Sequence, residues 1–267
     1  MGADIKSLRN RIRSVDSTLH LTKAMGLVAS SKIRRATMSM NRSREYTAAM
    51  EEVVGLLRVS PECAKSPYMT PKGQGDRVIV IAGDRGLAGG FNANLFRLAA
   101  TLKDTSFIPI GKRACDRFGP GLSSSEHFTV EDANRLAEEL CAAFLAGEFR
   151  RLGILYTRYC SLMTQEATLV WVLPLEKNRP AVRETPIFEP DEQTVLDAAV
   201  PTFVGGMVAA CVRESFASEV AARRMAMDSA GKNAQEMIDR LQLQYNRARQ
   251  NSITQEITEI VAGSNLQ

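Results

Sequence analysis

The sequence predicts an α/β protein in which a central α/β domain is flanked by two long helices that pair as an antiparallel coiled coil. Two observations support this fold class. Both ends of the chain show apolar residues at helical spacing, and proline is absent from residues 1–58 and 206–267. Between the ends, short β-branched runs alternate with helical segments, which is typical of an α/β sheet that is at least partly parallel.

Residues 1–58 are expected to form one helix. Apolar and small residues recur there at intervals of three and four, the seam of a heptad repeat, with Thr22 as a polar exception. The seam comprises Ile5, Leu8, Ile12, Val15, Leu19, Gly26, Ala29, Ile33, Ala36 and Met40. Prolines and glycines then cluster in residues 59–75, so we expect a linker in this segment.

The central domain is expected to span residues 76–195. Apolar runs at 78–82, 107–110, 152–156 and 167–173 predict strands. Helices are expected at 94–102 and 112–118. A third should start after Thr129, because Asp132 follows three residues later and completes a variant of the capping box.

Residues 206–267 are expected to form the second long helix, because the run of prolines ends at Pro201. Its predicted seam comprises Met227, Ala230, Ala234, Met237, Leu241, Tyr245, Ala248, Ser252, Ile257 and Ile260. A helix of 55–60 residues is about 80–90 Å long. Because two small-residue helices bury little surface, we expect this pair to depend on partner proteins.

Composition argues against catalysis and membrane insertion. The two histidines, His20 and His127, lie far apart, and the five cysteines form no C-x-x-C pair. We therefore expect no catalytic residues, no metal site and no cofactor. The apolar runs at 78–82 and 203–212 are shorter than the roughly 18–20 residues that span a bilayer.

The glycine-rich turn at 83–92 follows a predicted strand and precedes a helix, where phosphates often bind. It contains Gly83, Asp84, Arg85, Gly86, Gly89 and Gly90. It lacks the Lys-Ser/Thr pair of a P-loop, and its glycines do not have the spacing of a dinucleotide-binding loop. We therefore expect a structural turn that binds no nucleotide.

Positive charge is concentrated at the N-terminal end. Residues 1–58 carry eleven Lys or Arg against five acids. Lys23, Lys32, Arg34 and Arg35 form a candidate basic face. Such a face is compatible with solvent, with an acidic protein partner, or with nucleic acid. Only one aromatic residue, Tyr46, lies in this segment to stack on bases, so nucleic acid ranks third.

Three motifs carry a resemblance to a known family. Residues 21–25 with 28–36, the turn at 83–92, and residues 245–250 with 252–260 each resemble segments of the gamma subunits of F-type ATP synthases. The chain is most similar to the bacterial type without the chloroplast redox insert. Ala88 stands where many relatives have cysteine, so a thiol function in the turn is excluded.

The resemblance implies a rotor subunit with a coiled coil and a Rossmann-like central domain. It would have no active site of its own and would couple ion flow to ATP synthesis in the alpha–beta hexamer. The implied partners are the alpha, beta and epsilon subunits and the membrane c-ring, at the cytoplasmic face of the bacterial plasma membrane. The implied contacts with the beta subunit are Met25, Arg224, Arg249, Gln250 and Thr254. The alternative is a coiled-coil arm that binds nucleic acid.

Overall fold

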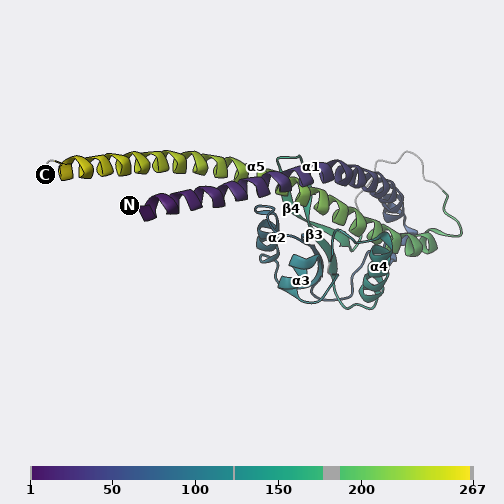
Figure 1. The fold of residues 1–267 in the computed structure, drawn as a ribbon. Helices are drawn as coiled ribbons and strands as arrows, with labels where there is room; N and C mark the ends of the chain where they lie inside the picture. The colour runs from purple at the N-terminus through teal and green to yellow at the C-terminus, as the bar shows by residue number, and fades with distance from the viewer. Residues whose placement is uncertain (1, 123, 177–186, 265–267) are drawn as a thin grey trace. The chain divides into compact units, whose positions relative to one another are not determined.

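The computed structural model describes residues 2–122, 124–176 and 187–264 (Figure 1). The chain divides into two compact units. Residues up to Ala29 and from Arg224 onward form the first unit, and Ser30–Arg223 forms the second. Both long helices are shared between the units, so the units do not coincide with the predicted segments, whose bounds stay a prediction.

Each end of the chain forms a single long helix. Helix α1 comprises Gly2–Val59 and α5 comprises Glu192–Ser264. Helix α5 thus begins earlier than the expected residue 206 and contains Pro201, which we had treated as a breaker. Proline removes one helical hydrogen bond. Burial of Leu196, Val200 and Phe203 around it offsets this loss, because all three lie in the main core.

The second unit contains a four-stranded sheet in the order β2-β1-β3-β4. The strands are β1 (Asp76–Ile81), β2 (Thr105–Ile110), β3 (Arg151–Tyr159) and β4 (Gln165–Leu173). Strand β1 is parallel to both β2 and β3, whereas β4 is antiparallel to β3. The prediction of four strands in a partly parallel sheet is therefore confirmed.

A 3-10 helix precedes the first strand, and three shorter α-helices lie between the strands. They are the 3-10 helix η1 (Glu62–Lys65) and helices α2 (Phe91–Ala99), α3 (Lys112–Phe118) and α4 (Val130–Leu145). The predicted capping box at the start of α4 is present. The Thr129 side chain accepts a hydrogen bond from the Asp132 backbone N–H, and the Asp132 carboxylate accepts one from the Thr129 backbone N–H.

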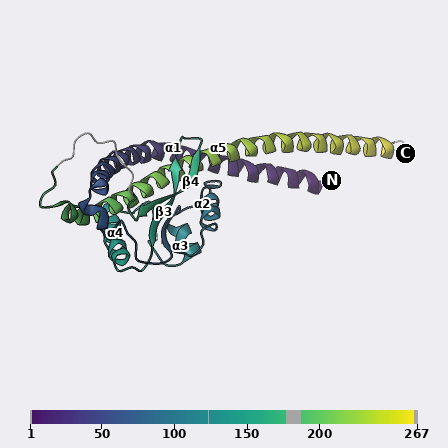
Figure 2. The same cartoon turned by 180° about the vertical axis from the view of Figure 1, so that it is seen from behind.

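The sheet separates two hydrophobic clusters, because successive residues of a strand point to opposite faces. Val78 and Val80 pack with α2 and α3 on one face. Ile79 and Ile81 pack on the other face with α4, with α5 and with the end of α1. Figure 2 shows these elements from the opposite side. The second unit therefore has helices on both faces of its sheet.

One described helix, α5, is long and apolar enough by composition to cross a membrane. We had underestimated this stretch, because Pro201 led us to divide it. Its apolar side chains between Leu196 and Val212 lie in the main core of the second unit. Packing against the sheet therefore accounts for the apolar composition of this helix.

The two long helices pair in antiparallel fashion in both units. In the first, Val15 and Leu19 pack with Ala234 and Ile238. In the second, Ala36 and Met40 pack with Ala217, and Gly206 packs against Tyr46. The predicted antiparallel coiled coil is confirmed for each unit.

The seam on α5 differs from the prediction at two places. Ile238 is buried and Met237 is 45% exposed, because the spacing changes here from three residues to four. Ile257 and Ile260 are also exposed, although we expected them to continue the seam. Because Val15 packs near Ile238, the antiparallel offset leaves the end of α5 without an opposing part of α1.

The corrected seam predicts the effect of two neighbouring substitutions. Ile238→Ala should lower the free energy of unfolding by about 2–3 kcal/mol, because it leaves a cavity against Leu19. Met237→Ala is the matched control and should change the unfolding free energy by less than about 0.5 kcal/mol. Urea unfolding followed by circular dichroism measures both. Equal losses of unfolding free energy in the two variants would contradict the corrected seam.

Candidate functional site

The glycine-rich turn connects the end of β1 to the start of α2. The Gly83 backbone N–H donates a hydrogen bond to Asn92 Oδ1 at 3.0 Å, which closes the turn. Gly83 also lies against the Glu219 side chain of α5. A Cβ atom at position 83 would come within 2.7 Å of the Glu219 carboxyl carbon, so a larger residue would have to displace this carboxyl group.

The Asp84 carboxylate joins the turn to two other segments, the start of α3 and the loop before α4. It accepts hydrogen bonds from the backbone N–H groups of Lys112, Ser125 and Glu126 and from the Ser124 hydroxyl, at 2.9–3.1 Å. Burial favours the neutral acid, but these bonds together outweigh it and hold the Asp84 pKa below its usual value. The chain therefore supplies its own anion to these donors.

Glu219 and Arg223 connect the turn to α5. Glu219 is buried and ion-paired with Arg223 one helical turn later. Burial raises the pKa of Glu219, and the pair with Arg223 opposes that rise. Arg223 also donates two hydrogen bonds to the Gly86 carbonyl oxygen, at 3.2 and 3.3 Å. The turn is thus bound to α5 by side chain and backbone together.

Glu126 connects the same region to α1. Its carboxylate pairs with the Lys32 ammonium at 2.5 Å and with the Arg85 guanidinium at 3.6 Å. The hydrogen bond from Lys32 outweighs burial and lowers the pKa of Glu126. Because Asp84 holds the backbone at Glu126, the turn, α1 and α5 form one connected network, which we call the turn network.

A second buried carboxylate on α5 makes a similar connection. Glu214 accepts hydrogen bonds from Arg44 on α1 at 2.7 Å and from the Tyr159 backbone N–H at 3.0 Å. Arg44 also donates to the Tyr159 carbonyl oxygen at 3.1 Å. This group therefore joins α1, α5 and the end of β3.

The residues of the predicted turn have different structural roles. Gly89 has a φ of 58°, a conformation that favours glycine. Leu87 adopts a φ of 63° without being glycine and is 62% exposed. Gly90 directly precedes α2. Gly86 supplies the carbonyl that Arg223 binds, and Arg85 is largely exposed beside Glu126.

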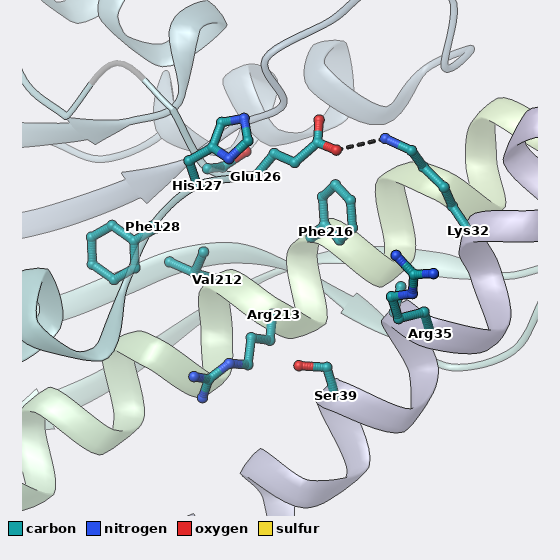
Figure 3. A pocket seen from close by; sticks show the side chains of 11 residues that line it. Lys32, Arg35, Ser39, Glu126, His127, Phe128, Val212, Arg213 and Phe216 are labelled. Carbon is teal, nitrogen blue, oxygen red and sulfur yellow. Dashed lines mark hydrogen bonds and ion pairs between the residues drawn. The ribbon is translucent and has the colours of Figure 1, made fainter.

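The predicted basic face does not act as one free surface. Arg34 and Lys23 are exposed on α1. Lys32 is paired with Glu126, and with Arg35 it lines a cavity of about 350 Å³ (Figure 3). No local sequence pattern predicts this difference, because the acid that binds Lys32 lies far away along the chain.

The predicted beta-subunit contacts lie in the first unit. Met25 and Arg224 are partly exposed, and Arg249, Gln250 and Thr254 are exposed. The Thr254 hydroxyl donates to the Gln250 carbonyl oxygen within the helix, at 3.0 Å. These side chains are available to a partner, and the assignment of the partner stays a prediction.

Sequence reasoning missed Glu126, Glu214, Glu219 and Arg223. A signal was present for the last two: an acid and an arginine spaced four apart in a largely apolar stretch of helix. Among the described residues, no group of three or more His, Cys, Asp or Glu side chains could hold a metal ion.

Comparison with known proteins identifies the family. The family model described as ATP synthase matches residues 4–265. The ATP synthase gamma chain of Ruminococcus albus is 39% identical over 98% of both chains. The chain belongs to the ATP synthase gamma chain family. The gamma chain of Geotalea daltonii is 38% identical, again over 98% of both chains.

A solved structure supports the fold. A chain from the mitochondrial ATP synthase of Euglena gracilis, in an OSCP/F1/c-ring assembly, aligns with a TM-score of 0.72 at 17% identity. The alignment covers 99% of this gamma chain and 95% of the other chain. The gamma-chain fold is therefore retained at low sequence identity.

Substitution of Asp84 tests the turn network. Asp84→Asn should destabilise the protein at neutral pH by about 2 kcal/mol, because the amide accepts the four donors poorly. The folded-state pKa of Asp84 is lowered, so its stabilisation is present above the unfolded pKa of about 3.9 and is lost as pH falls through the folded value. The difference between wild type and variant should therefore shrink in acid.

Asp116→Asn is the control, because Asp116 is about half exposed and pairs only with the similarly exposed Arg113 among the described residues. Urea unfolding between about pH 3 and 7 measures both variants. Two results would contradict the role given to the Asp84 carboxylate. One is a difference in unfolding free energy between wild type and Asp84→Asn that does not change with pH, and the other is an equal loss of unfolding free energy in the control.

Proposed function

We propose that this gamma chain is the central-stalk rotor subunit of an F-type ATP synthase. It would couple ion flow across the membrane to ATP synthesis or hydrolysis in the alpha–beta hexamer by rotating. Membership of the gamma chain family is the observation that carries this proposal. The fold agrees, because the similar Euglena gracilis chains come from assemblies described as the rotor and as OSCP/F1/c-ring.

The turn network provides a physical route for torque in the second unit. A torque on the sheet reaches α1 through the ion pair of Glu126 with Lys32. It reaches α5 through Glu219, packed on Gly83, and through Arg223, bound to Gly86. Because the contacts attach to both helices, the pair turns with the sheet instead of twisting apart.

We further propose that this chain is not catalytic and that the catalytic sites belong to the beta subunits. Phosphoryl transfer requires positive charge and usually metal around the phosphates. The turn lacks the Lys-Ser/Thr pair of a P-loop, and its Asp84 carboxylate would repel a phosphate. The partners would be the alpha, beta and epsilon subunits and the c-ring, at the cytoplasmic face of the bacterial plasma membrane.

Met25, Arg224, Arg249, Gln250 and Thr254 are proposed to contact the beta subunit. All of them are at least partly exposed, and the three on the final part of α5 are exposed. Polar side chains in these positions can form and break hydrogen bonds with a moving partner at modest cost in free energy. Lys23 and Arg34 offer exposed positive charge to an acidic surface of the same partner. The nucleic-acid alternative receives no support from the comparisons.

Reconstitution tests the proposed function. The isolated chain should hydrolyse no ATP above the buffer background. Mixed with the alpha and beta subunits of the same organism, it should co-elute with them and give a complex with sustained hydrolysis, because an asymmetric rotor makes the three catalytic sites unequal. Magnesium-dependent hydrolysis that stays with the lone chain, or failure to bind the hexamer, would contradict the proposal.

A double substitution on α5 tests the proposed contacts. Arg249→Ala with Gln250→Ala should lower turnover of the reconstituted complex by about tenfold or more, because a lost charge-assisted hydrogen bond costs about 1.5–3 kcal/mol. Gln244→Ala is the control, since Gln244 is also exposed but lies about 120–140° around the helix from both residues. Helicity should be unchanged in all variants. A fall in helicity parallel to the fall in turnover would show a structural role instead.

A further inference from the structure

A cavity of about 350 Å³ lies in the second unit between α1, α5 and the loop that precedes α4. Figure 3 shows Arg35 and Ser39 on α1, Val212, Arg213 and Phe216 on α5, and Phe128 from the loop. Its volume is within the range of pockets that hold small organic molecules, about 300–1,000 Å³. It is too small for a folded peptide or a nucleic acid strand.

The charge of this cavity is not balanced by the residues that line it. Glu126 is the only acid among them, and it is already paired with Lys32 and Arg85. No hydrogen bond or ion pair joins the Arg35 side chain to any residue in the part of the chain that the structure describes. Arg213 donates one of its five N–H groups to Ser43 Oγ at 2.8 Å. Ser43 does not line this cavity, and in Figure 3 the Arg213 guanidinium points away from Arg35. Arg35 is therefore the guanidinium with donors available at the cavity.

The remaining wall is apolar. Phe128, Val212 and Phe216 contribute side chains to it. An inorganic anion would pair with Arg35 but leave the aromatic wall in contact with water. A neutral apolar molecule would do the reverse. Both kinds of surface are used only by a molecule that carries an acidic group and an apolar body.

We propose that this cavity binds a small organic anion with a flat apolar body and one carboxylate or sulfonate group. Arg35 binds the acidic group, because a guanidinium forms charge-assisted hydrogen bonds with such anions. Phe128, Val212 and Phe216 cover the apolar body. The ligand therefore touches α1, α5 and the loop at once, and binding stabilises the folded second unit by mass action. This site is independent of the proposed rotor function.

Three probes separate the two parts of the proposed recognition. Isothermal titration of the full-length chain with 2-naphthoate supplies both the charge and the flat body. Acetate supplies the charge alone, and 2-naphthalenemethanol supplies the body without the charge. We expect saturable binding of 2-naphthoate with one site per chain, and at least about tenfold weaker binding of the other two, since either loses one class of contact.

Substitutions locate the binding. Arg35→Gln should raise the dissociation constant of 2-naphthoate about tenfold, which corresponds to one charge-assisted hydrogen bond. Arg34→Gln is the matched control, because Arg34 is the neighbouring, exposed arginine outside the cavity, and it should change the constant by less than about twofold. Ser39→Phe, which fills the cavity from its exposed edge, should abolish binding while thermal unfolding stays near that of the wild type.

Several results would overturn this proposal. They are absence of 2-naphthoate binding up to millimolar concentration, equally tight binding of the uncharged alcohol, and an equal loss of 2-naphthoate affinity in Arg34→Gln and Arg35→Gln. Binding that survives Ser39→Phe in a folded chain would place the ligand elsewhere and would also overturn it. None of these results bears on assembly with the alpha and beta subunits, so the rotor function is tested separately.

Discussion

The two buried carboxylates of α5, on Glu214 and Glu219, are the constraint on which the arrangement of the second unit depends. A carboxylate removed from water needs a charged or hydrogen-bonding partner, or it destabilises the fold. Glu214 finds its partners on α1 and β3, and Glu219 packs against the turn that follows β1. Only one register of α5 satisfies both, so these acids fix how the helix lies on the sheet.

Nonpolar packing supplies most of the stability of this unit. The two acids determine in which register α5 packs on the sheet. A helix with an apolar stripe can slide by one turn and still bury apolar surface. Sliding α5 by one turn would separate Arg223 from Gly86 and would move the Glu219 carboxyl group away from Gly83, on which it packs closely. A rotor must transmit torque without slipping of its helices. Contacts that hold α5 in one register therefore suit the proposed function.

Much of the fold could be predicted from local sequence. The strands, α3 and the capping box at Thr129 follow from short-range patterns and were found. The start of α5 was missed because a proline rule was applied to Pro201 without knowledge of the core around it. Ile238 was missed because a strict heptad was continued where the spacing changes.

The candidate site was less predictable, for a different physical reason. The turn was recognised as structural from its glycines, but its partners Glu126, Glu219 and Arg223 lie far away along the chain. Ion pairs between such distant residues leave no periodic signal in a single sequence. The same limit applies to Lys32, which sequence reasoning placed on an open basic face and which is paired with Glu126 in the structure.

Single-molecule rotation tests the central claim most directly. Cys160 is the one exposed thiol among the five cysteines, and it follows β3 at the surface of the second unit, so it can carry a bead. With the alpha–beta hexamer fixed to a surface, ATP should drive stepwise rotation of the bead in one direction. A bead that stays still, or moves only by diffusion, while the same complexes hydrolyse ATP would contradict the account of this chain as a rotor.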